Sequence, residues 1–200
     1  MNCNKESISK LGEAIVDIVA GKSPKNSGRP AEDNEYGVLK VSAIGELDFV
    51  ESENKVLLQD EDFISDLEVQ AGFLLVTRAN ALLSGIGRVC FVKNTRPKLM
   101  LSDKTLRLVV NYSKATDRFL LQALRSKIYR DYVEKVASGT GAKNISQAKL
   151  KKASIPLPSV EKQKEVEEVL FKFDSAIENA EKRLEQANSL KKLLLNSNLG

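Results

Sequence analysis

The chain has 200 residues, of which 42% are hydrophobic and 29% charged, with a formal net charge of +4. This length supports one sizeable core with an appendage rather than two full domains. Cys3 and Cys90 lie far apart and in no metal-ligand spacing, so the sequence suggests neither a disulfide framework nor a zinc site, and a reducing cytosol fits best. No apolar run approaches the roughly 20 residues that cross a bilayer, so we expect a cytoplasmic protein without a membrane span.

The chain contains no histidine. The commonest general base, the usual partner of a nucleophilic serine or cysteine, and the commonest transition-metal ligand are therefore missing. Carboxylates for Mg²⁺ chemistry are present, but they form a charge run typical of a solvated face. The run comprises Glu46, Asp48, Glu51, Glu53, Asp60, Glu61, Asp62, Asp66 and Glu68. We therefore expect no catalytic residues, metal or bound cofactor, with an Mg²⁺-dependent hydrolase as a distant alternative.

Short apolar runs separated by turn residues occupy the chain from Leu11 to Tyr112, a pattern typical of a strand-rich region. We predict strands at residues 14–19, 38–44, 73–77, 87–92 and 106–110. The first run also fits one face of a helix, so a helix remains an alternative there. The basic, turn-rich segment at residues 21–30 should form an exposed loop.

One helix is predicted at residues 117–136, ended by the glycines of residues 138–141. Its apolar stripe comprises Phe119, Leu120, Ala123, Leu124, Ile128, Tyr132 and Val136. A short segment capped by Asn144 or Ser146 follows, and then the rigid stop Ile155-Pro156-Leu157-Pro158. We place a domain boundary at this stop, between residues 1–155 and 156–200.

A long helix is predicted from the Ser159 cap to about Leu195. Its apolar residues alternate at spacings of four and three: Val166, Leu170, Phe173, Ile177, Ala180, Leu184, Ala187 and Leu194. Lys191 interrupts this seam, with Leu190 beside it. A helix of about 55 Å exceeds one small domain, so the heptads favour a coiled coil over a helix packed on its own domain. The predicted fold class is α+β, with a strand-rich domain followed by this helix.

Two basic segments are candidates for nucleic-acid contacts. Arg78 and Asn80 follow the strongest strand, and these side chains can bind guanine and adenine with two hydrogen bonds each. A second basic group, Lys93, Arg96, Lys98, Lys104 and Arg107, surrounds a turn and could neutralise phosphates. Ordinary surface ion pairs and turn support are the alternative interpretation. Aromatic residues make up only 6% of the chain, which favours duplex over single-strand binding.

The order of these segments resembles that of one protein family. It runs Leu11-Gly12-Glu13, Gly21-Lys22-Ser23-Pro24, residues 38–44, Phe73-Leu74-Leu75-Val76-Thr77-Arg78 and Gly85-Ile86-Gly87-Arg88-Val89. A more specific junction runs from Gly139 through Ile155-Pro156-Leu157-Pro158 to Glu161 and Gln163. Over nearly the whole chain, this pattern resembles the specificity subunits of type I restriction-modification systems. The usual member carries two recognition domains and two long helices, whereas this sequence has one of each.

The resemblance implies an α+β target-recognition domain at residues 1–155 that reads double-stranded DNA. The residues expected to contact DNA are Lys22, Lys25, Arg29, Arg78, Asn80, Lys93, Arg96, Lys98, Lys104, Lys143 and Asn144. For Lys143 and Asn144, contact with the methyltransferase is the alternative. It also implies methyltransferase (modification) subunits as partners and, through the complex, the restriction/translocase subunit. S-adenosylmethionine is expected in the methyltransferase subunit, which acts on a flipped adenine.

The resemblance further implies that residues 156–200 serve dimerisation and methyltransferase docking. The expected contact residues are Val166, Leu170, Phe173, Ile177, Leu184 and Leu194. Two such helices lying antiparallel would form a symmetric homodimer that reads an interrupted palindrome. The alternative function is a coiled-coil adaptor whose head binds protein rather than DNA.

Overall fold

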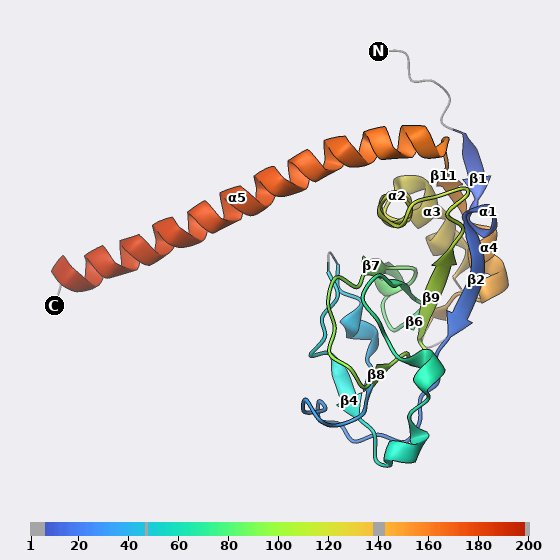
Figure 1. Cartoon of the computed structure of the whole chain (residues 1–200), viewed down its shortest axis with the longest axis horizontal. Coiled ribbons are helices and arrows are strands. Elements are labelled where there is room, and N and C mark those ends of the chain that lie inside the picture. The colour runs from blue at the N-terminus through green and yellow to red at the C-terminus, as the bar shows by residue number, and fades with distance from the viewer. Residues whose placement is uncertain (1–6, 47, 138–142, 199–200) are drawn as a thin grey trace. The chain divides into compact units, whose positions relative to one another are not determined.

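The computed structural model describes residues 7–46, 48–137 and 143–198. The chain divides into two compact units, Met1–Val160 and Glu161–Gly200. The first unit mixes strands with short helices, and the second consists of helix alone (Figure 1).

A four-stranded antiparallel sheet forms the centre of the first unit. Its order is β2 (Ile15–Ala20), β9 (Thr105–Val110), β5 (Leu74–Thr77) and β7 (Val89–Phe91). The strands predicted at residues 14–19, 73–77, 87–92 and 106–110 are confirmed. The helical alternative for the first run is wrong, because helix ends after one turn, α1 (Leu11–Ala14), and the chain continues as β2.

A second sheet has the order β4 (Asn54–Val56), β3 (Gly37–Leu39) and β8 (Leu99–Met100). β3 runs antiparallel to β4 and parallel to β8. The strand predicted at residues 38–44 is shorter than expected, because the 3-10 turn Val41–Ala43 follows β3. Side chains from both sheets share one buried cluster: Leu39, Ala43, Ile44, Val69, Leu75, Cys90, Val92, Leu99 and Leu101. Further 3-10 turns are Asp60–Asp62, Ser65–Leu67 and Leu83–Gly85.

The single helix predicted at residues 117–136 is two helices, α2 (Asp117–Ala123) and α3 (Lys127–Val136). Ser126 causes the break: its hydroxyl accepts from the Tyr129 N–H at 3.4 Å and donates to the Ala123 carbonyl at 2.6 Å. The break shifts the helical phase, so Tyr129 and Val133 are buried in α3 while Ile128 is exposed. The expected glycine stop at residues 138–141 lies outside the described residues.

Two short strand pairs join distant parts of the chain. β1 (Ile8–Lys10) pairs with β11 (Ser154–Pro156), and β6 (Ala79–Asn80) pairs with β10 (Lys143–Asn144). The segment predicted to be a rigid stop, Ile155-Pro156-Leu157-Pro158, therefore begins within strand β11. Of the two candidate caps, Ser146 is the N-cap of α4 (Gln147–Lys151).

The second unit consists of one helix, α5 (Val160–Asn198). Large apolar side chains of the heptad seam are exposed along it, among them Phe173, Ile177 and Leu184. No helix in the described part of the chain is long and apolar enough to cross a membrane.

Candidate nucleic-acid interface

Several loops of the first unit meet at one edge of the four-stranded sheet. Because neighbouring strands are antiparallel, the ends of β2 and β5 lie beside the starts of β9 and β7. The register shows this directly, since Thr77 pairs with Thr105, and Val76 with Val89. The segments at this edge carry basic residues that we call the basic edge: Lys22, Arg78, Arg88, Lys104 and Lys143.

Backbone hydrogen bonds hold these segments together. The Arg78 N–H donates to the Lys104 carbonyl at 2.8 Å, and the Ile145 N–H donates to the Arg78 carbonyl at 2.9 Å. The Lys22 N–H donates to the Leu101 carbonyl at 3.1 Å. Glycine is required at position 21, where a Cβ would lie 2.3 Å from the Leu101 carbonyl oxygen. Segments that carry basic residues and lie far apart in sequence are therefore held together at this edge.

One carboxylate, Asp103, is embedded in the basic edge. Its Oδ1 accepts from the Ser23 hydroxyl at 2.5 Å and from Lys104 Nζ at 2.9 Å. Partial burial acts to raise the pKa of Asp103, but these hydrogen bonds and the charges of Lys104 and Arg78 outweigh it and lower the pKa. Asp103 is therefore ionised at neutral pH, and it orients Lys104 without cancelling the charge of the whole edge.

Arg78 and Asn80 differ in how their side chains are engaged. The Arg78 side chain is partly exposed and makes no hydrogen bond or ion pair with any other described residue. The Asn80 side chain shapes its own turn, because Oδ1 accepts from the Leu82 N–H at 3.1 Å and Nδ2 lies against Gly85. Lys143 stands opposite Asn80 in the β6–β10 pair, which puts both side chains on one face. Asn144, the other residue of β10, is exposed and stands opposite Ala79.

The predicted basic group after β7 does not form one surface. Lys93, Arg96 and Lys98 follow the far end of β7, away from the basic edge, and only Lys104 of that candidate set belongs to the edge. Lys93 pairs with Asp48 at 3.1 Å.

Arg96 and Lys98, the other two basic residues that follow β7, support local structure. Arg96 Nη1 donates to the Glu35 carbonyl at 3.0 Å, so this guanidinium braces a neighbouring loop. Lys98 Nζ donates to the Asn34 carbonyl at 2.9 Å and lies 4.9 Å from the Tyr36 ring centroid. Arg107, noted with this group in the sequence, has its guanidinium 3.6 Å from the Phe73 ring centroid.

The loop after β2 contributes Lys22 to the basic edge and then leads away toward β4. Lys25 is exposed, and its carbonyl accepts from the Leu58 N–H at 3.2 Å. Arg29 makes two hydrogen bonds to the Glu35 carboxylate, at 2.6 and 2.5 Å. These bonds are the main reason that the pKa of Glu35 is lowered to about 2. Arg29 is thus already paired with a carboxylate.

Arg88 belongs to the basic edge but was not among the expected DNA contacts. Its carbonyl accepts from the Thr77 N–H at 2.9 Å and from the Thr77 hydroxyl at 3.0 Å, which puts it directly across from the end of β5. The sequence contained a usable signal. The strands predicted at residues 73–77 and 87–92 are consecutive, and when consecutive strands pair antiparallel, the start of the second lies beside the end of the first.

The described residues contain no group of three or more His, Cys, Asp or Glu side chains that could hold a metal ion. Cys90 is buried, and burial raises the pKa of its thiol to about 12. The arrangement at the basic edge is one of cations and hydrogen-bond donors on a fixed scaffold, which suits binding of a polyanion.

The first unit is thus an α+β domain with a basic edge. Residues 6–189 match the family described as the type I restriction modification DNA specificity domain, and the chain belongs to that family.

Named relatives are specificity subunits. The chain is 34% identical over 181 residues to the type I restriction enzyme EcoEI specificity subunit of Escherichia coli, covering 89% of this chain and 30% of that protein. It is 29% identical over 195 residues to the MjaVIII specificity subunit of Methanocaldococcus jannaschii, covering 94% of this chain and 44% of that protein. The chain therefore spans less than half the length of these two relatives.

Solved structures share the fold. The type I restriction-modification S subunit from M. genitalium aligns with a TM-score of 0.59 at 16% identity, covering 90% of this chain and 42% of that one. The HsdS subunit from Thermoanaerobacter tengcongensis aligns with a TM-score of 0.57 at 16% identity, covering 92% of this chain and 41% of that one.

Proposed function

We propose that this chain recognises a specific sequence in double-stranded DNA as a specificity component of a type I restriction-modification complex, and that the basic edge is its DNA-binding surface. The observation that carries this proposal is the convergence of Lys22, Arg78, Arg88, Lys104 and Lys143 on one edge of the sheet. Cations fixed on a rigid backbone bind phosphates and orient the neighbouring side chains toward bases.

Within the basic edge, Arg78 is our candidate for direct base recognition. It is partly exposed, and its side chain makes no hydrogen bond or ion pair with another described residue, so its guanidinium can make a two-bond contact with guanine. The Asn80 side-chain oxygen already accepts a hydrogen bond within its turn, so a two-bond contact between this amide and adenine would require the turn to open. We therefore expect Arg78 to contribute more to sequence discrimination than Asn80.

The chain itself is proposed to be non-catalytic and to bind no cofactor. Methylation would be carried out by methyltransferase subunits that bind S-adenosylmethionine, and cleavage by a restriction/translocase subunit joined through the complex. Names of relatives, such as type I restriction enzyme specificity subunit, support this division of labour.

The α5 seam is proposed to pair with a second long helix in an antiparallel coiled coil. The large apolar seam residues Phe173, Ile177 and Leu184 are exposed, and such a stripe is stabilised by burial against a partner helix. If the partner is a second copy, the two-fold axis across the helices gives two identical domains that read inverted half-sites of an interrupted palindrome. Methyltransferase subunits would dock on the same helical region.

Binding selectivity tests the main proposal. The chain, alone and with methyltransferase subunits, is presented with a random duplex library, and the enriched target is compared with shuffled duplex. We expect Arg78→Ala to reduce discrimination by about 1 to 3 kcal/mol, because one two-bond base contact is worth that much. Lys93→Ala, which changes a lysine at the opposite end of β7, is the matched control and should keep full discrimination. Binding that is absent or insensitive to salt would favour a protein-binding adaptor instead.

A further inference from the structure

The turn between β6 and β7 is built rigidly and lies within the basic edge. Asn80 Oδ1 accepts from the Leu82 N–H at 3.1 Å, and the Gly85 N–H donates to the Leu82 carbonyl at 3.0 Å. The Asn80 amide packs against Gly85 so closely that a Cβ there would lie 2.3 Å from Nδ2. Both sides of Leu82 are therefore fixed by hydrogen bonds, and the turn has little freedom to collapse onto the domain.

Helix α3 clamps the same turn through Arg130. Arg130 Nη1 donates to the Ile86 carbonyl at 2.6 Å, and Nη2 donates to the Ser84 carbonyl at 3.3 Å. The Arg130 side chain is only 23% exposed, and it also lies 3.6 Å from Glu134. A charged group held this way anchors two consecutive parts of the turn to the helix.

Within this anchored turn, the apolar side chain of Leu82 is exposed to solvent. It is 69% exposed, the highest value among the large apolar side chains of the described residues. An exposed leucine by itself is ordinary. Here, however, Leu82 follows Arg78 and Asn80 on a turn held at both ends, with Lys143 across from Asn80.

We infer that Leu82 is a specificity-determining residue that contacts the C5-methyl group of a thymine in the major groove, and that Arg130 is a positioning residue for it. This inference rests on the proposed function. The cations of the basic edge can satisfy phosphates, whereas a leucine gains free energy only against an apolar group. Thymine carries the one methyl group that unmodified DNA displays in the major groove.

Thymine-to-uracil replacement isolates this contact, because uracil keeps the base pair and removes only the methyl group. In the enriched target, each thymine is replaced singly, and the dissociation constant is measured for wild type and for Leu82→Ala. For wild type, we expect uracil at one or two positions to weaken binding by about four-fold, because the free energy of burying one methyl group corresponds to that change in affinity. For Leu82→Ala, the same replacements should have no effect, and its affinity for the thymine duplex should itself be about four-fold lower.

Three further variants separate a direct contact from an effect on the fold. Val16→Ala removes a similar side chain, 62% exposed, at the start of β2 and away from the basic edge, and it should keep the wild-type uracil response. The readout is the ratio of the dissociation constants for the uracil and thymine duplexes. Arg130→Ala should bring this ratio toward one at the same positions as Leu82→Ala. Arg130→Lys, which retains one donor to the turn, should give a ratio between that of Arg130→Ala and that of wild type. A purely structural role for Arg130 would lower stability without changing this ratio.

The outcomes are distinguishable. If wild type selects a target but the uracil responses of Leu82→Ala equal those of wild type, the inference is wrong and the proposed function stands; a Leu82 that binds a partner protein would give this result. If the chain selects no duplex under any condition, the proposed function fails, and the inference fails with it.

Discussion

Gly87 offers a test of the packing that supports the basic edge. It has a positive φ of 65°, and a Cβ there would lie 2.9 Å from the Tyr129 hydroxyl oxygen and 3.0 Å from both Val133 methyl carbons. Tyr129 and Val133 are fully buried, so neither can easily move aside. Gly87→Ala therefore combines two costs, the left-handed backbone and overpacking of the core.

A second glycine separates these two costs. Gly72 also has a positive φ, of 91°, but a Cβ at this position would have nothing within 4 Å, so Gly72→Ala carries the backbone cost alone, about 1 kcal/mol. Adding about 1 to 3 kcal/mol for overpacking, we expect Gly87→Ala to lower the free energy of unfolding by about 2 to 4 kcal/mol. Gly28→Ala, at an ordinary φ and in open space, should change it by less than about 0.5 kcal/mol.

Urea denaturation followed by circular dichroism measures all three variants on one scale. We expect destabilisation to increase in the order Gly28→Ala, Gly72→Ala, Gly87→Ala. If Gly87→Ala and Gly72→Ala had equal unfolding free energies, the close approach of Tyr129 and Val133 to Gly87 would be refuted.

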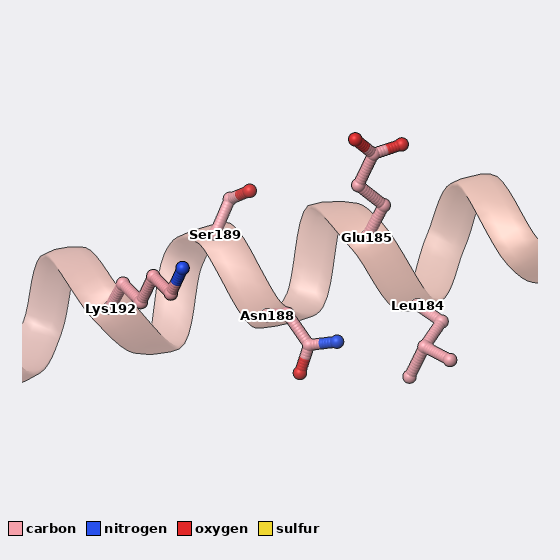
Figure 2. Close-up of a pocket in the computed structure, with 5 residues that line it drawn as sticks. All are labelled: Leu184, Glu185, Asn188, Ser189 and Lys192. Carbon is pink, nitrogen blue, oxygen red and sulfur yellow. The ribbon is translucent and has the colours of Figure 1, made fainter.

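Three other predictions concern charge, the helix and the buried thiol. Lys104→Ala should weaken binding to all duplexes and reduce the slope of log affinity against log salt by about one, whereas Lys93→Ala should leave the slope unchanged; titrations at several salt concentrations would decide this. Leu184→Asp should shift an α5-mediated dimer to monomer in light scattering, while Ser189→Asp, on the opposite side of the helix from Leu184 (Figure 2), should not; equal effects would contradict the seam. Cys90, whose pKa is raised to about 12 by burial, should resist a thiol reagent at pH 8 until urea unfolds the domain, in a variant with the other cysteine replaced by serine; rapid labelling of the folded protein would show that the thiol is accessible.

The sequence alone determined the features that depend on local pattern. Apolar runs bounded by turn residues located β2, β5, β7 and β9, because strand propensity and the alternation of turns act over a few residues. The uninterrupted stretch after Pro158 located α5 for the same reason, since no glycine or proline interrupts it. The local pattern failed at Ser126, where the hydrogen bonds of its hydroxyl with Tyr129 and Ala123 divide the predicted helix despite a continuous apolar stripe.

Only the tertiary structure decided which basic residues act together. Lys104 and Lys93 belong to one segment of sequence, yet β9 pairs with β5 in a register that brings Lys104 to Arg78 and leaves Lys93 at the other end of β7. The pairing of Asn80 with Lys143 likewise joins residues that no local propensity connects. The basic residues of the site could be listed from the sequence. Their arrangement could not, because strand register is set by burial of the sheet faces against distant parts of the chain, and it exists only once the distant strands pair.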